Sequence, residues 1–264
     1  MRLKNKIAVV VGAGQTPGVT IGNGRATAIR FAQEGAEVLL IDKDMDSAEE
    51  TYSMIKKEGG KASVFRADIT VENECRAIVD NCMERYGRID ILHNNVGLSE
   101  GDDFITKLKE ENWLRLMDVN LKGMVLTCKH VLPVMREEKD GVIINISSTA
   151  SICTNRPIAY RAAKAAINAL TQTLAVEYAP FGVRINAILP GLMDTPMAVE
   201  RRAKEAGVHR DVVRKERDDK VPLRNKMGTA WDVAAAAVFL ASDEAQFITG
   251  ILLPVDGGLT CRIG

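Results

Sequence analysis

Short apolar runs alternate with longer amphipathic segments along almost the whole chain of 264 residues. The runs have the length of strands, whereas the segments between them have the length and apolar spacing of helices. The predicted strands are Ile7–Val11, Glu37–Ile41, Ala62–Arg66, Ile89–His93, Gly141–Ile146, Arg184–Leu189 and Leu252–Val255. The predicted helices are Gly24–Glu34, Met45–Glu58, Val71–Tyr86, Lys109–Arg136, Tyr160–Ala179 and Ala230–Ala241.

Several of the predicted strands are apolar throughout and do not alternate between polar and apolar residues. The runs Ala8–Val11 and Val142–Ile144 contain no polar residue. A strand has this composition when a parallel sheet buries both of its faces under helices. The repeated β-α order therefore predicts an α/β fold of the Rossmann-like, doubly wound type, with about seven parallel strands flanked by helices and joined by right-handed crossovers.

No linker, repeat or low-complexity tract divides the chain, so residues 1–264 are predicted to form a single domain. Residues 196–228 interrupt the β-α rhythm, because they are highly charged and contain helical stretches but no predicted strand. A long insertion between the last two strands of such a sheet suggests a lid over the substrate site. A pair of solvated helices explains the same pattern equally well.

Charge and composition exclude several functional classes. Basic and acidic residues number 35 each, so no net field would recruit nucleic acid or an anionic membrane. No apolar run approaches the roughly 18 residues of a membrane span, and Gly12 and Gly14 interrupt the first apolar run before it could serve as a signal peptide. Five cysteines without a CxxC pair and three scattered histidines predict no disulfide framework and no metal site. We expect a cytoplasmic enzyme that acts on a small molecule.

A glycine-rich turn joins the first predicted strand to the first predicted helix. In such a turn, backbone N–H groups and the helix N-terminus can approach a pyrophosphate closely. Gly12 stands at the strand end and Gly22, Asn23 and Gly24 open the helix, with about six residues more between them than in the usual dinucleotide-binding turn. Alternatively, Gly18 takes the place of the first glycine, because it forms a complete G-x-x-x-G-x-G with the other two.

Asp42 ends the second predicted strand, where an acidic residue bears on the choice of cofactor. Its carboxylate can accept hydrogen bonds from both hydroxyls of an adenosine ribose. The same carboxylate would repel a 2′-phosphate by roughly 1–4 kcal/mol at about 4 Å. The pattern therefore favours NAD. Lys43 follows directly and could contact a 2′-phosphate, so NADP remains an alternative.

Tyr160 and Lys164 are four residues apart and therefore share one face of a helix. A phenol titrates near about pH 10 in isolation, which is too high for acid–base catalysis at neutral pH. An ammonium beside it and a positively charged nicotinamide would stabilise the phenolate, and a shift of about three pH units requires about 4 kcal/mol. Alone, a tyrosine and a lysine at this spacing occur often by chance.

Further motifs surround this pair. Asn145–Ser148 ends the strand before it, and Asn186–Gly191 follows it. Together with the glycine turn, these motifs resemble the short-chain dehydrogenase/reductase family, and the resemblance covers essentially the whole chain. The other matching segments are Asp68-Ile69, Asn94–Gly97, Val119–Gly123 and Val255–Gly258.

The resemblance implies a role for each matching residue. Tyr160 would be the general acid–base, and Lys164 would hold the nicotinamide ribose and lower the pKa of Tyr160. Ser148 would hydrogen-bond the substrate oxygen, and Asn120 would hold a water that links Lys164 to solvent. The implied cofactor contacts are Gly12, Gly22, Asn23, Gly24, Asp42, Asp68, Ile69, Asn95, Val96, Gly97, Tyr160, Lys164, Pro190, Gly191, Met193 and Thr195. The resemblance also suggests a homotetramer, or a homodimer.

Two serines compete for the catalytic position. The family's usual spacing from serine to tyrosine selects Ser147, whereas alignment of the Asn-Ile-Ser-Ser motif selects Ser148. We favour Ser148, because a one-residue deletion in the loop Thr149–Ala159 is easier than a register slip in a buried strand, which would turn every side chain to the other face.

The substrate is less constrained than the reaction. Ser148, Ala150, Arg156 and Leu192 are expected to contact it, and Arg156 with the cationic lid suggests a carboxylate or similar anion on a cyclic or short aliphatic frame. The leading hypothesis is an NAD-dependent dehydrogenase or ketone reductase acting on a secondary alcohol or ketone. The alternatives are an NADP-dependent ketoreductase and a cofactor-binding sensor or scaffold without catalysis. An enoyl reductase of similar fold would place its lysine further from its tyrosine, and a halohydrin dehalogenase would carry arginine at that position.

Overall fold

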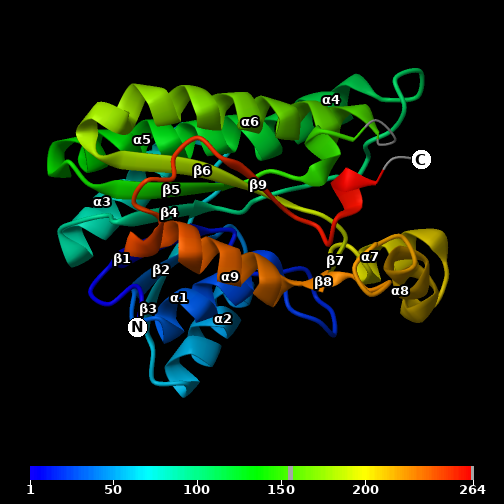
Figure 1. Ribbon diagram of the computed structural model, residues 1–264, viewed down its shortest axis with the longest axis horizontal. Helices are drawn as coiled ribbons and strands as arrows, with labels where there is room; N and C mark the ends of the chain where they lie inside the picture. Colours follow the sequence, from blue (N-terminus) through cyan, green and yellow to red (C-terminus); the bar gives the residue numbers. More distant parts are fainter. Residues whose placement is uncertain (154–156, 263–264) are drawn as a thin grey trace.

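Seven parallel strands form the central sheet of the computed structural model, which describes residues 1–153 and 157–262 (Figure 1). The strand order is β3-β2-β1-β4-β5-β6-β9, so the chain builds the sheet outward from β1 and reverses direction between β1 and β4. This confirms the predicted doubly wound fold. The bounds are β1 Ile7–Val11, β2 Glu37–Asp42, β3 Lys61–Arg66, β4 Ile91–Asn94, β5 Gly141–Ile146, β6 Val183–Pro190 and β9 Leu252–Val255.

Helices cover both faces of the sheet (Figure 1). One layer consists of α1 Asn23–Gln33, α2 Met45–Lys57 and α9 Ala230–Ala241. The opposite layer consists of α3 Glu72–Tyr86, α4 Glu110–Met117, α5 Gly123–Glu138 and α6 Ile158–Tyr178. None of the described helices is long and apolar enough to cross a lipid bilayer.

Local capping explains why the predicted helix bounds are accurate to one or two residues. The Asp44 side chain accepts a hydrogen bond from Ser47 N at 3.2 Å and starts α2. Thr229 and Asp232 form a reciprocal capping box at the start of α9. Gly87 ends α3 with a φ of 73°, a conformation that favours glycine.

One predicted helix is divided. The segment Lys109–Arg136 was expected to be continuous, but α4 and α5 are separated by a π-helical turn at Asp118–Lys122. A π-helical turn widens the backbone by one residue and is common at functional sites. Apolar spacing along the sequence is too coarse to reveal one extra residue in a turn.

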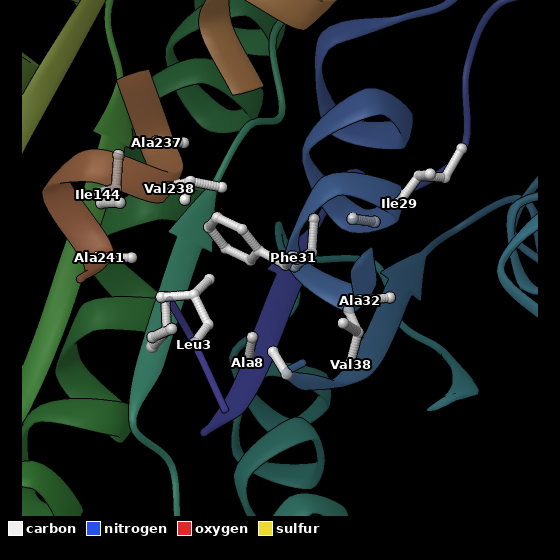
Figure 2. Close-up of a cluster of buried hydrophobic side chains, with 14 of the residues drawn as sticks. Leu3, Ala8, Ile29, Phe31, Ala32, Val38, Ile144, Ala237, Val238 and Ala241 are labelled. Atoms are coloured by element: carbon white, nitrogen blue, oxygen red, sulfur yellow. The ribbon is translucent and has the colours of Figure 1, made fainter. Parts of the chain in front are cut away.

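The core lies on both sides of the sheet, as the apolar strands predicted. On β1, Ala8 and Val10 belong to the cluster under α1 and α9, whereas Val9 and Val11 belong to the cluster under α3, α5 and α6. Phe31 is fully buried, and Figure 2 shows its ring pointing from α1 towards α9. Burial of one such side chain contributes about 1.5–3 kcal/mol to folding.

The predicted lid contains two short helices, α7 Glu200–Ala206 and α8 Arg210–Asp218, which lie together beyond one end of the sheet (Figure 1). Its last residue belongs to a strand, because β8 Gly228–Thr229 pairs in parallel with β7 Met193–Asp194. The expectation that 196–228 contains no strand is therefore wrong at this residue, since a two-residue strand is too short to produce a hydrophobic pattern.

His93 lies on β4 inside the core and is fully buried. Its ring meets Phe31 edge-on with centroids 5.9 Å apart, and neither ring nitrogen has a hydrogen-bond partner among the described residues. Burial lowers the pKa of His93 to about 3, because the positive charge would lose its hydration. His93 is therefore neutral in the folded protein throughout the physiological range.

This burial predicts a specific loss of stability in acid. Below about pH 6.5 the unfolded chain binds a proton at His93 that the folded protein does not bind, so the free energy of unfolding falls by about 1.4 kcal/mol per pH unit until about pH 3. We expect His93→Leu to remove this component from urea unfolding measured between about pH 4 and 7. His209→Leu, at an exposed position, should keep the wild-type slope. Equal slopes for wild type and His93→Leu would contradict the prediction.

Candidate active site

The carboxyl ends of the central strands open into one cleft of about 860 Å³. It lies where the strand order reverses, which is where open α/β sheets bind ligands. Pro196, Met197 and Ala198 of the lid form part of its wall, and Ser148, Tyr160 and Lys164 line it. Every residue predicted to contact the cofactor also lines it: Gly12, Gly22, Asn23, Gly24, Asp42, Asp68, Ile69, Asn95, Val96, Gly97, Tyr160, Lys164, Pro190, Gly191, Met193 and Thr195.

The glycine turn brings the start of α1 against the end of β1. A Cβ at Gly24 would lie 1.9 Å from the Gly12 carbonyl oxygen, so only glycine permits this approach. Gly12 has a φ of 78°, and its carbonyl oxygen accepts a hydrogen bond from Asn95 Nδ2 at 3.2 Å. Gly18 lies away from the strand end, against Pro196. The structure therefore places Gly12, and not Gly18, at the end of β1.

The extra residues of the turn are braced by side chains. Gln15 Oε1 accepts a hydrogen bond from Gly22 N at 2.8 Å, and Gln15 Nε2 donates to the Thr20 carbonyl oxygen at 3.3 Å. On α2, Ser47 Oγ accepts from Gln15 N at 2.8 Å and donates to the Gln15 carbonyl oxygen at 3.1 Å. The turn is thus preorganised. Ser47 was not predicted, because its sequence neighbours mark it only as an ordinary helix position.

The Asp42 carboxylate is oriented by two backbone donors at the rim of the cleft. Oδ2 accepts a hydrogen bond from Gly14 N at 2.9 Å, and Oδ1 accepts from Asp44 N at 3.0 Å. A carboxylate offers about four acceptor positions, so two remain for the hydroxyls of a ribose. The glycine turn lies at one end of the cleft and Thr195 lies at the other. The residues of this cleft therefore fit a nicotinamide dinucleotide.

Lys164 is buried beside Tyr160, with 1% of its surface exposed. Its ammonium donates to the Ile146 carbonyl oxygen at 2.8 Å and to the Val96 carbonyl oxygen at 3.4 Å. Nζ lies 5.7 Å from the centroid of the Tyr160 ring. Burial lowers the pKa of Lys164 to about 7. The ends of β4 and β5 therefore fix a titratable cation next to the tyrosine.

The two candidate serines have different environments. Ser147 is buried, and its hydroxyl donates to the Lys164 carbonyl oxygen at 2.9 Å. Ser148 is half-buried, and its hydroxyl accepts from Ala150 N at 3.1 Å. The Ser147 hydroxyl is thus engaged in packing β5 against α6, whereas the Ser148 hydroxyl can still donate its proton to a ligand.

Asn120 is buried in the π-helical turn next to the lysine. Its Oδ1 accepts from Leu98 N at 2.8 Å, and its Nδ2 donates to the carbonyl oxygens of Leu98 at 2.7 Å and Leu116 at 2.8 Å. A Cβ at Gly97 would lie 3.6 Å from both Asn120 Oδ1 and Lys164 Nζ, so both groups border the same glycine. Asn120 therefore ties the loop after β4 to the helix layer beside Lys164.

Asp102 is a site residue that the sequence did not reveal. Its two carboxylate oxygens accept hydrogen bonds from Ala159 N at 3.0 Å and Tyr160 N at 2.9 Å. A carboxylate at a helix N-terminus satisfies free N–H groups and complements the helix dipole. Asp102 thereby fixes the first turn of α6, which carries Tyr160, from a loop distant in sequence.

Ala150 and Leu192, which were expected to contact the substrate, are not among the described residues that line the cleft. Leu192 packs under the lid with Val199, Val221 and Met227, and Ala150 is buried in a tight 3₁₀ turn. Both side chains are therefore packed in the interior, and their contact with a substrate stays a prediction. Arg156 lies outside the described residues. Leu98 and Met197 form apolar parts of the wall.

Comparisons with known proteins agree on one family. A family model described as enoyl-(acyl carrier protein) reductase matches residues 18–260. The chain is 34% identical to the 3-oxoacyl-[acyl-carrier-protein] reductase FabG of Thermotoga maritima, over 98% of this chain and 99% of that protein. It is 40% identical to 3beta-hydroxysteroid dehydrogenase 1 of Eggerthella lenta, over 99% of this chain and 96% of that protein.

A solved structure extends the similarity to the fold. The ligand-free aldohexose dehydrogenase of Thermoplasma acidophilum superposes with a TM-score of 0.86 at 34% identity, covering 99% of this chain and 96% of that one. Together with the geometry of the cleft, these matches show that the chain belongs to the short-chain dehydrogenase/reductase family, a family of oxidoreductases that use nicotinamide cofactors.

Proposed function

We propose that this protein is an NAD-dependent dehydrogenase or reductase that moves a hydride between the cofactor and a secondary alcohol or ketone. The observation that carries the proposal is the buried Lys164 ammonium, held by two carbonyl oxygens with Nζ 5.7 Å from the centre of the Tyr160 ring. A fixed cation beside a phenol stabilises the phenolate and so tunes it for proton transfer.

The protein's own residues supply the proton chemistry. When bound, the nicotinamide ring supplies or accepts the hydride. During ketone reduction, the Tyr160 hydroxyl gives its proton to the substrate oxygen while the carbonyl carbon receives the hydride, and oxidation reverses both transfers. The Lys164 charge stabilises the phenolate that remains. The Ser148 hydroxyl donates to the same substrate oxygen and orients it. Asn120, which borders Gly97 together with Lys164, would hold the water through which Tyr160 is reprotonated.

The preference for NAD rests on Asp42. Its carboxylate is held at the cleft rim by Gly14 N and Asp44 N, where it would accept the ribose hydroxyls and repel a 2′-phosphate. Lys43 also lines the cleft, which is the feature that supports the alternative of an NADP-dependent ketoreductase.

The substrate oxygen is proposed to be a hydroxyl or a ketone. The relatives' names describe a 3-oxoacyl reductase and a hydroxysteroid dehydrogenase, and the four-residue spacing of Tyr160 and Lys164 supports that reaction over enoyl reduction. Arg115 and Arg217 line the cleft and support a substrate that carries a carboxylate or similar anion.

We also propose a homotetramer in the cytoplasm, with α4, α5 and α6 at an interface. The exposed apolar side chains Leu114, Val125 and Val176 on these helices support such an assembly. The proposed number of four subunits rests on the resemblance to the family.

Tyr160→Phe tests the catalytic assignment. Removing the phenol hydroxyl should lower turnover of the best alcohol substrate by about 10²–10⁴-fold, because the acid–base group is lost. Dinucleotide affinity, measured by calorimetry, should change little. Tyr178→Phe at the far end of the same helix is the control and should keep wild-type turnover. Unchanged turnover in Tyr160→Phe would show that the catalytic assignment of Tyr160 is wrong.

The two serines give opposite predictions. Ser148→Ala should lower turnover about a hundredfold, because a donor to the substrate oxygen is removed, while thermal unfolding stays near wild type. Ser147→Ala should retain most of the turnover but lose about 1 kcal/mol of stability with its buried hydrogen bond to Lys164. The reverse pattern would assign the catalytic role to Ser147.

Asp42→Asn tests cofactor choice without changing the size of the side chain. Wild type should turn over faster with NAD than with NADP at equal subsaturating concentrations. The variant should shift the ratio of kcat/KM values towards NADP by about tenfold or more, since the repulsion of a 2′-phosphate is removed. Asp46→Asn, in the first turn of α2, should leave the ratio unchanged. Equal use of both cofactors by the wild-type protein would refute the NAD assignment.

A further inference from the structure

The extended glycine turn reaches the lid. A Cβ at Gly18 would lie 2.7 Å from Pro196 Cβ and 3.0 Å from Glu200 Cδ, so the backbone at Gly18 packs closely against these two side chains. Val19 N donates a hydrogen bond to Glu200 Oε1 at 3.2 Å. Pro17 and Pro196 both line the cleft. The cleft wall formed by the glycine turn and the cleft wall formed by the lid therefore meet at this contact.

Glu200 is held in place from the lid side. Its Oε1 also accepts from Arg210 Nε at 3.1 Å, and its side chain is 18% exposed. Arg210 and Arg214 contact the two carboxylate oxygens of Asp194 at 3.7 Å and 3.0 Å. Asp194 stands between Met193 and Thr195, both in the cleft wall. A chain of charged contacts thus connects the extended turn with the strand at the other end of the cleft.

Arg201, the next residue on α7, contacts a different wall. Its Nη2 donates to Ser99 Oγ at 2.9 Å, and its Nε donates to the Met197 carbonyl oxygen at 3.2 Å. Ser99 belongs to the loop after β4, which follows Gly97 and Leu98 towards Asp102. The first turn of α7 therefore has two separable contacts, one through Glu200 to the extended turn and one through Arg201 to this loop.

We propose that Glu200 is a positioning residue that holds the lid against the extended glycine turn and thereby sets the rate at which the dinucleotide leaves. A ligand that touches both walls is released when the walls separate, and the contact of Glu200 with Val19 opposes that separation. The extra residues of the turn have a function on this account, because Gly18 and Val19 among them make the contact with the lid. The inference rests on the proposed function only in that a nicotinamide dinucleotide occupies this cleft.

The test is the dissociation rate of NADH, or of NADPH should it bind more tightly, followed by stopped-flow fluorescence after displacement with excess oxidised cofactor. Glu200→Ala should release the cofactor about tenfold faster, because a hydrogen bond to a charged group is lost. Gly18→Ala should also release it faster, since the new methyl group would push against Pro196. Glu200→Gln keeps an acceptor for Val19 N and should show a smaller increase.

Arg201→Ala is the matched control, because it shares the helix turn but not the contact with the extended turn. Because its contact joins the lid to the loop after β4, it should accelerate release clearly less than Glu200→Ala does. Since Glu200 touches no reacting atom and its loss speeds release, the KM for the cofactor in Glu200→Ala should rise while kcat does not fall.

The outcomes separate the two proposals. Wild-type release rates in both Glu200→Ala and Gly18→Ala, with unchanged thermal unfolding, would overturn the role of Glu200 and leave the proposed function standing. Equal acceleration in Arg201→Ala would assign the effect to the lid as a whole and also overturn it. Failure of the wild-type protein to bind either dinucleotide would overturn the proposed function, and this inference with it.

Discussion

A buried ammonium is costly to a folded protein, and the arrangement around Lys164 is understandable as a response to that cost. Burial lowers the pKa of Lys164 from its usual value of 10.5 to about 7. Between these values the unfolded chain binds a proton that the folded protein does not, so stability rises with pH there, and the full penalty applies below about pH 7. The carbonyl oxygens of Ile146 and Val96 offset part of this penalty. They can do so only because β4 and β5 are adjacent, parallel and end at the same level.

The helices around Lys164 are also arranged to hold this buried ammonium in place. Lys164 and Tyr160 keep their relative positions because they share α6. The helix is held at its start by Asp102 and at the Lys164 carbonyl oxygen by Ser147. The π-helical turn lets Asn120 contact the loop after β4 through both the oxygen and the nitrogen of its side-chain amide. Sheet, loop and helix therefore converge on one cation. A site assembled from several elements in this way is rigid where proton transfer needs fixed distances.

The sequence predicts the fold and the cleft lining well, because both depend on local signals. Buried parallel strands need uninterrupted apolar runs, and a close backbone approach needs glycine at positions such as Gly12 and Gly24. Asp102, Ser47 and Glu200 escape prediction, since each acts on a backbone group more than 30 residues away and resembles any polar surface residue. The packing of Leu192 under the lid also escapes prediction, because its position next to Gly191 does not determine on which side of the backbone the side chain is buried. The choice between Ser147 and Ser148 could not be settled from spacing alone, because it depends on which hydroxyl packs against α6.

The glycine turn is longer than the family pattern, and its extra residues have a defined structure. Extra residues in a loop add little loop-closure entropy, but they must still satisfy their backbone groups. Here Gln15 and Ser47 satisfy several of them inside the protein, and Val19 N is satisfied by Glu200 of the lid. An insertion that only enlarged the loop would leave such groups to solvent. Because this one places a donor against a carboxylate on the opposite wall, the length of the turn and the position of the lid are physically coupled.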